Sequence, residues 1–313
     1  GLRAPLWFVF LVTAVSAGVS TVEHSARSAT IPRLFGISRL PAALSVHQVM
    51  VQLAQVAGPS LAGVLIAAAG LPVAYAVDVL CFAAGLAFIL RLRPLPVEHP
   101  PAPLSWRAPA EGLRHVWRTE VLLGIFIADL VAMIFGMPRA LFPALAQDVF
   151  HVGARGLGLL YAAPAAGALV ATPLLGWIPR VRRQAATVLV AVAAWGLFIT
   201  AFGFSGRTFA LGLVLLALAG ASDMVSAVFR STLVQSLTPD RLRGRLSAFN
   251  SMVVTTGPRL GDLEAGAVAS LTTPFFSVVS GGLLSLAGAA VLAALMPGPV
   301  SYTHLTLPTI LRV

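Results

Sequence analysis

The sequence predicts an all-α polytopic membrane protein, and three observations support this fold class. Hydrophobic residues make up 58% of the 313 residues, charged residues only 10%, and the mean hydropathy is +0.91. Nine apolar stretches are long enough to cross a bilayer as helices, which takes about 20 residues each. One block of sequence occurs twice, about 200 residues apart. A surface of this composition requires lipid as its solvent.

The nine predicted spans follow one another along the whole chain. They lie near 5–24, 43–69, 73–91, 121–146, 156–178, 185–205, 208–230, 245–271 and 274–296. All 21 basic residues are arginines, and most lie in alternate loops between these spans. Arginine-rich loops stay in the cytoplasm, so the C-terminus is expected there. Because the arginines are dispersed, the net charge of +10 indicates membrane topology and not a nucleic-acid partner.

The repeated block joins an arginine-containing segment to a long helix that carries a Gly-Pro pair. The first copy contains Arg27 and Gly58-Pro59, and the second contains Arg230 and Gly257-Pro258. Two halves built on one plan are typical of secondary transporters.

The repeat also predicts the domain organisation. Residues 1–93 are expected to be helices 4–6 of a first six-helix half, and 119–297 to be the complete second half. The segment 94–118 is a cytoplasmic central loop in which six prolines, Pro109 the last, interrupt any helix. Nine of twelve helices are thus present, and three are expected before Gly1. The polar residues 298–313 are expected to be a non-native tail.

Several short stretches resemble one known family. They are Ser28 to Pro32, Gly58-Pro59 with Gly63, Asp78, Pro138 to Pro143, Asp223 with Arg230, and Gly261 to Gly266. With the two-half plan, residues 1 to about 297 resemble the major facilitator superfamily, and within it the branch of enterobactin-exporter-like and drug-efflux proteins. The resemblance implies a bacterial inner-membrane transporter that works by alternating access, exporting a siderophore or an amphiphilic drug-like molecule.

The Gly58-Pro59 helix is similar to the family's antiporter motif, with Gly63 one turn on. Glycine allows neighbouring backbones to approach and proline allows a bend, so these residues, like Gly257 and Pro258, are candidates for gating. Ordinary packing of small residues is an equally good reading.

Two intramembrane carboxylates are candidates for proton coupling, because an ionisable group in the membrane costs free energy and usually has a function. Asp129 is preferred, since no basic residue lies within one turn of its helix. Asp223 comes second, because Arg230 lies two turns on and can neutralise it. Arg259 and Asp262 are expected to form a structural pair at i,i+3.

Substrate contacts are expected from Gln52 and Gln55 on the Gly-Pro helix and from Arg139. For the glutamines, polar packing in the core is an equal alternative. The expected partners are a small-molecule substrate, protons and lipid, with the protein acting as a monomer.

An enzyme is the rival class, and the sequence does not favour it. It shows no Gly-x-Ser-x-Gly, no His-x-x-x-His and no phosphate-binding glycine loop with lysine. No cofactor or metal is therefore expected. A non-transporting receptor or scaffold on the same fold, and an importer of a small metabolite, remain alternatives.

Overall fold

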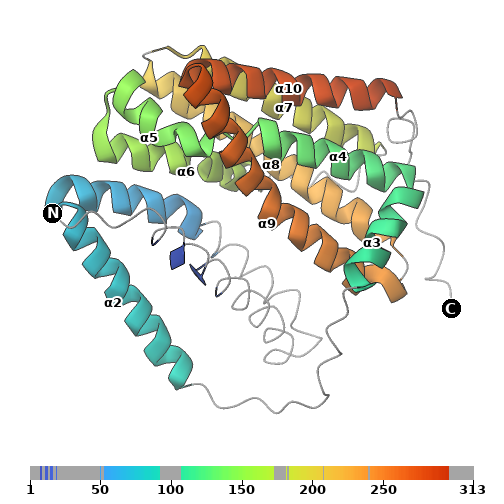
Figure 1. Cartoon of the computed structure of the whole chain (residues 1–313), viewed down its shortest axis with the longest axis horizontal. Helices are drawn as coiled ribbons and strands as arrows, with labels where there is room; N and C mark the ends of the chain where they lie inside the picture. Colours follow the sequence, from blue (N-terminus) through green and yellow to red (C-terminus); the bar gives the residue numbers. More distant parts are fainter. Residues whose placement is uncertain are drawn as a thin grey trace. The chain divides into compact units, whose positions relative to one another are not determined.

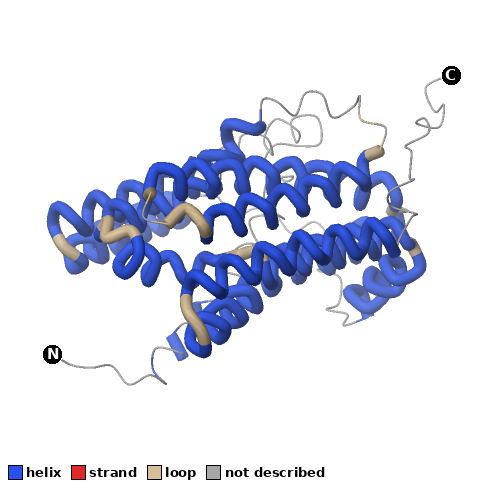
Figure 2. The backbone as a smooth tube through the Cα atoms, turned by 90° about the horizontal axis from the view of Figure 1, so that it is seen from above, coloured by secondary structure: helices blue, strands red, loops and turns tan. Residues whose placement is uncertain are grey.

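The computed structural model describes residues 53–91, 107–172, 181, 183–206, 208–238 and 240–295, with seven single residues between 8 and 50. Every described secondary-structure element is helical, which confirms the predicted all-α class (Figure 2). The described residues from 53 to 86 and from 107 to 295 belong to one compact unit. Of the predicted span 5–24, six residues are described and all six are helical, whereas the tail 298–313 lies outside the described residues.

The helices follow the predicted spans closely (Figure 1). A helix at Leu53–Ala69 is followed by α2 (Leu71–Leu90), α3 (Arg107–Arg118), α4 (Glu120–Phe135), η1 (Pro138–Leu141), α5 (Phe142–Ala144), η2 (Leu145–Val149), α6 (Gly153–Ala171), α7 (Gln184–Gly203), α8 (Phe209–Leu237), α9 (Asp240–Leu271) and α10 (Pro274–Leu295).

Six of the described helical segments are long and apolar enough to cross a membrane. They are α2, the 30-residue segment Glu120–Val149, α6, α7, the Phe209–Val234 part of α8, and α10. The helix α9, predicted as a span over 245–271, is not among them. Its sequence is less apolar because Arg259, Asp262 and Glu264 lie within it.

Glycines bring the helices of the second half into close contact. A Cβ atom at Gly167 of α6 would collide with the Ala217 carbonyl of α8, and one at Gly220 of α8 would collide with the Pro164 carbonyl of α6. The helices α7 and α10 also pack side by side, with Gly196 facing α10 (Figure 1). Small residues at such contacts let backbones pack closely where no hydrophobic effect drives association.

The central loop contains a helix, which the sequence analysis did not predict. Within 94–118, residues Arg107–Arg118 form α3, which packs against α4 and α9. The expectation that Pro109 interrupts any helix is wrong, because this proline lies in the first turn, where its missing N–H would have no helical acceptor. Val116 is 1% exposed in the core of the second half, so this part of the loop is packed against the helices.

The span that begins with α4 is broken in its C-terminal part. Met137, which precedes Pro138, is extended, with φ −109° and ψ 90°, and α4 ends at Phe135. A residue before proline avoids the helical region, which explains the break. The Gly136 carbonyl accepts a hydrogen bond of 3.0 Å from the Trp195 indole N–H of α7. The predicted continuous span 121–146 is therefore a helix followed by short 3-10, α and π segments.

Candidate functional site

A buried ion pair joins α4 to α8. The Arg230 guanidinium donates from Nη1 to Oδ1 of Asp129, and the two residues are 7% and 3% exposed. Asp129 lies nine residues after Glu120 and Arg230 seven residues before Leu237. At 1.5 Å per residue these depths are about 14 and about 10 Å from the same end of the bundle.

This pair overturns the reason for preferring Asp129 as the proton carrier. Asp129 is not an isolated carboxylate, because its basic partner comes from another helix. Nor does Arg230 pair with Asp223, since its side chain contacts α4 instead. Spacing along one helix does not reveal a partner that lies on another helix. The similar depth of Asp129 and Arg230 in their spans was the signal that could have predicted the contact.

A second group of charged side chains lies around the break after α4. Arg139 of η1 and Asp223 of α8 are both exposed, and the Arg139 guanidinium interacts electrostatically with the carboxylates of Asp223 and Asp262. Asp262 also accepts a hydrogen bond from the Ala140 backbone N–H, and the Tyr161 hydroxyl donates one to the Arg139 carbonyl at 3.3 Å. The group combines residues from η1, α6, α8 and α9.

Arg259 and Asp262, which were predicted to pair, belong to this larger group, and among the described residues they form no direct ion pair. Arg259 interacts electrostatically with Asp262, as does Arg139. Among the described residues, Arg230 forms an ion pair within 4 Å and Arg139 forms none. Arg139 is thus an exposed guanidinium at the broken end of a span, with carboxylates nearby but no direct ion-pair partner among the described residues.

The Gly-Pro helix shows which of its residues serve packing. A Cβ atom at Gly63 would lie 2.7 Å from the Ala154 carbonyl and 3.2 Å from the Gly158 Cα, and Gly63 is buried. A Cβ atom at Gly158 would in turn collide with the Pro59 carbonyl. A Cβ atom at Gly58 would meet nothing within 4 Å. Gly63 and Pro59 therefore form a close contact with α6, and Gly58 does not.

The second Gly-Pro pair lies on α9. A Cβ atom at Gly257 would come within 2.9 Å of the Met133 Sδ of α4, and Pro258 lies inside the helix. Of the two glutamine candidates, Gln52 lies outside the described residues. Gln55 is exposed on the Leu53–Ala69 helix.

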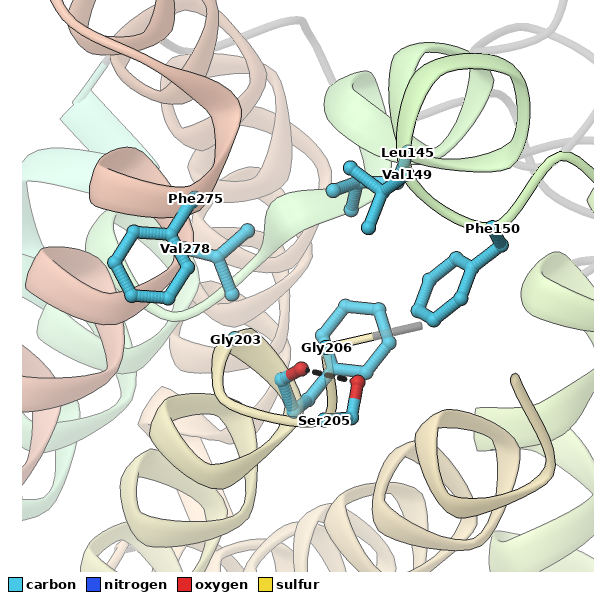
Figure 3. A pocket seen from close by; sticks show the side chains of 9 residues that line it. Leu145, Val149, Phe150, Gly203, Ser205, Gly206, Phe275 and Val278 are labelled. Carbon is cyan, nitrogen blue, oxygen red and sulfur yellow. Dashed lines mark hydrogen bonds between the residues drawn. The ribbon is translucent and has the colours of Figure 1, made fainter. Parts of the chain in front are cut away.

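Two cavities lie near the helix ends. One, of about 460 Å³, lies between Leu53–Ala69 and α2, and its wall includes Gly58, Tyr75 and Asp78. The other, of about 30 Å³, is lined mainly by apolar side chains, including Phe150 and Phe275 (Figure 3). The Ser205 hydroxyl in its wall donates to the Phe202 carbonyl at 2.7 Å, so this small cavity offers little polar chemistry.

Comparison with known proteins decides the family. Residues 2–261 match the family model described as Major Facilitator Superfamily. The chain belongs to the major facilitator superfamily. The superfamily assignment makes it a multi-pass membrane protein of a transporter family and not an enzyme.

Within the superfamily, the chain is similar to proteins named as enterobactin exporters. It is 31% identical over 265 residues to Enterobactin exporter EntS of Citrobacter koseri, covering 83% of this chain and 62% of that protein. It is 28% identical over 268 residues to Enterobactin exporter EntS of Salmonella choleraesuis, covering 85% of this chain and 64% of that protein. The chain thus spans less than two thirds of the length of these relatives.

Proposed function

We propose that this chain is the larger part of a secondary active exporter of a siderophore or a related amphiphilic small molecule, acting by alternating access in the bacterial inner membrane with its C-terminus in the cytoplasm. The similarity to enterobactin exporters over more than four fifths of the chain is the observation that carries this proposal. The predicted two-half plan and the arginine distribution support it.

Coupling to protons is proposed to depend on Asp223. This carboxylate is exposed, and it lies 14 residues after the start of α8, which is about 21 Å into the membrane. Asp129, by contrast, is held in a buried ion pair. Reversible protonation requires a carboxylate that water can reach in at least one state, and that requirement favours Asp223.

Arg139 is proposed to contact the substrate. It shares the electrostatic environment of Asp223, so protonation of that carboxylate changes the local field at the guanidinium. Proton uptake and substrate release are thereby linked at one place in the transport cycle. The exposed side chains of both residues are consistent with a location on the wall of the transport cavity.

Export is tested in a bacterium that lacks its own efflux systems. Expression of the complete gene is expected to lower the cellular accumulation of a radiolabelled catecholate siderophore or an amphiphilic dye. Unchanged accumulation of both probes in a strain with verified membrane expression would refute the exporter proposal. The receptor and the importer would then remain as alternative functions. Uptake that rises on expression would identify an importer.

Proton coupling is tested with three matched substitutions in the complete protein. Asp223→Asn is expected to abolish uphill export while downhill exchange continues. Asp148→Asn, which changes an exposed carboxylate on η2, is the control and should leave uphill export unchanged. Asp129→Asn should act mainly on stability. Uphill export at the normal rate by the Asp223→Asn protein would exclude Asp223 as the carrier.

A further inference from the structure

One face of α3 combines a tryptophan with two arginines. Trp117 is 65% exposed, and Arg114 and Arg118 are exposed as well. Residues three and four apart share a face of a helix, so these three side chains lie together. An exposed cationic face alone is well solvated by water. An exposed indole on the same face as two guanidinium groups is instead typical of the boundary between a bilayer and water, where aromatic rings and arginines both concentrate.

The opposite face of α3 is fixed to the bundle. Val116 is 1% exposed and packs in a core cluster with residues of α4, α7, α8 and α9, including Leu246. The His115 Nε2 atom lies 3.3 Å from the Leu237 carbonyl at the end of α8, within hydrogen-bond distance. The helix therefore cannot rotate to bury Trp117 without losing these contacts.

The position of α3 places this face at the membrane boundary. The span Glu120–Val149 starts two residues after Arg118, so the end of α3 lies where the apolar segment begins. In Figure 1, α3 lies beside the first turns of α9. The exposed acidic residue next to it, Glu120, offsets only one of the two exposed arginines.

We propose that Arg114, Trp117 and Arg118 of α3 form a binding site for anionic phospholipid headgroups. The guanidinium groups bind the phosphate, since arginine offers paired donors in a planar arrangement that matches phosphate oxygens. The indole ring of Trp117 rests among the glycerol and upper acyl groups. Because α3 contacts α4, α8 and α9, a bound lipid stabilises the ends of these helices together.

The site is tested by tryptophan quenching in the complete protein, reconstituted in vesicles with equal parts of phosphatidylglycerol and phosphatidylcholine. Bromine is placed on the acyl chains of one lipid or the other. The signal of Trp117 is the difference between the protein and its Trp117→Phe variant. Brominated phosphatidylglycerol is expected to quench Trp117 more strongly than brominated phosphatidylcholine.

Substitution of each arginine provides the matched comparison. Arg114→Gln and Arg118→Gln should each lower the relative affinity for phosphatidylglycerol about fivefold, which is the effect of one arginine near an anionic surface. Arg155→Gln, which removes an exposed arginine from the first turn of α6, should not change it. Equal quenching by both lipids would overturn the proposal. So would an unquenched Trp117, which would mean that protein covers this face.

Discussion

Removing Arg230 while keeping Asp129 is expected to destabilise the protein strongly. Asp129 is 3% exposed, and its Oδ2 atom has no hydrogen-bond partner within the described part of the chain. In an Arg230→Met variant, the carboxylate would lose the partner of Oδ1 as well. Breaking a buried ion pair from one side costs about 3–5 kcal/mol, because the remaining charge is left uncompensated.

This cost should be visible as a change in thermal stability. For a domain of the size of the second half, 1 kcal/mol corresponds to roughly 2–4 °C in Tm, so Arg230→Met should lower Tm by about 6–20 °C. The assay is thermal unfolding of the complete protein in detergent at one fixed heating rate. A double variant, Asp129→Leu with Arg230→Met, buries no charge and should recover most of the loss.

Two results would refute the reasoning about the pair. One is an Arg230→Met protein with the Tm of the unaltered protein, which would mean that Asp129 is not held as an uncompensated buried charge. The other is a double variant that loses as much stability as the two single variants summed. That result would show two independent packing roles and no coupling between the side chains.

The remaining predictions concern helix contacts. Gly220→Ala should lower the free energy of unfolding by about 1–3 kcal/mol, because the added methyl group collides with the backbone of α6. Gly266→Ala should be neutral or stabilising, because a Cβ atom there meets nothing within 4 Å. Thermal unfolding of the two variants distinguishes these outcomes. Trp195→Phe should cost about 1–3 kcal/mol by leaving a buried carbonyl unpaired, measured in the same way. Gly63→Ala should slow transport or lower stability while Gly58→Ala changes neither, and equal effects would contradict the packing contact.

The fold class was predictable because composition and span length decide it. A chain with 10% charged residues and apolar runs of about 20 residues has few soluble alternatives. The helix α3 is hard to predict because six prolines lie within 94–118, although Pro109 occupies a position in the first turn that helices tolerate. The apolar residue Val116 of α3 indicates the side of this helix that packs against the bundle.

The candidate site was less predictable, since its contacts join residues far apart in sequence. Asp129 and Arg230 are separated by 101 positions, and no spacing rule along one helix relates them. The group around Arg139 depends on the break at Met137, where the backbone leaves the helical conformation. Pro138 indicates a break in the helix, but the sequence does not show which helices lie next to Arg139 and supply its partners.

The broken span Glu120–Val149 has a consequence for how the protein is made. Hydrocarbon offers no partner for the backbone groups that a break leaves open, so a segment inserted alone would leave these groups unsatisfied. The Gly136 carbonyl is satisfied by Trp195 of α7, and the Ala140 N–H by Asp262 of α9. Both partners come later in the chain. The break itself follows from Pro138, but its open backbone groups gain these partners only after the downstream helices have been synthesised and have packed against it.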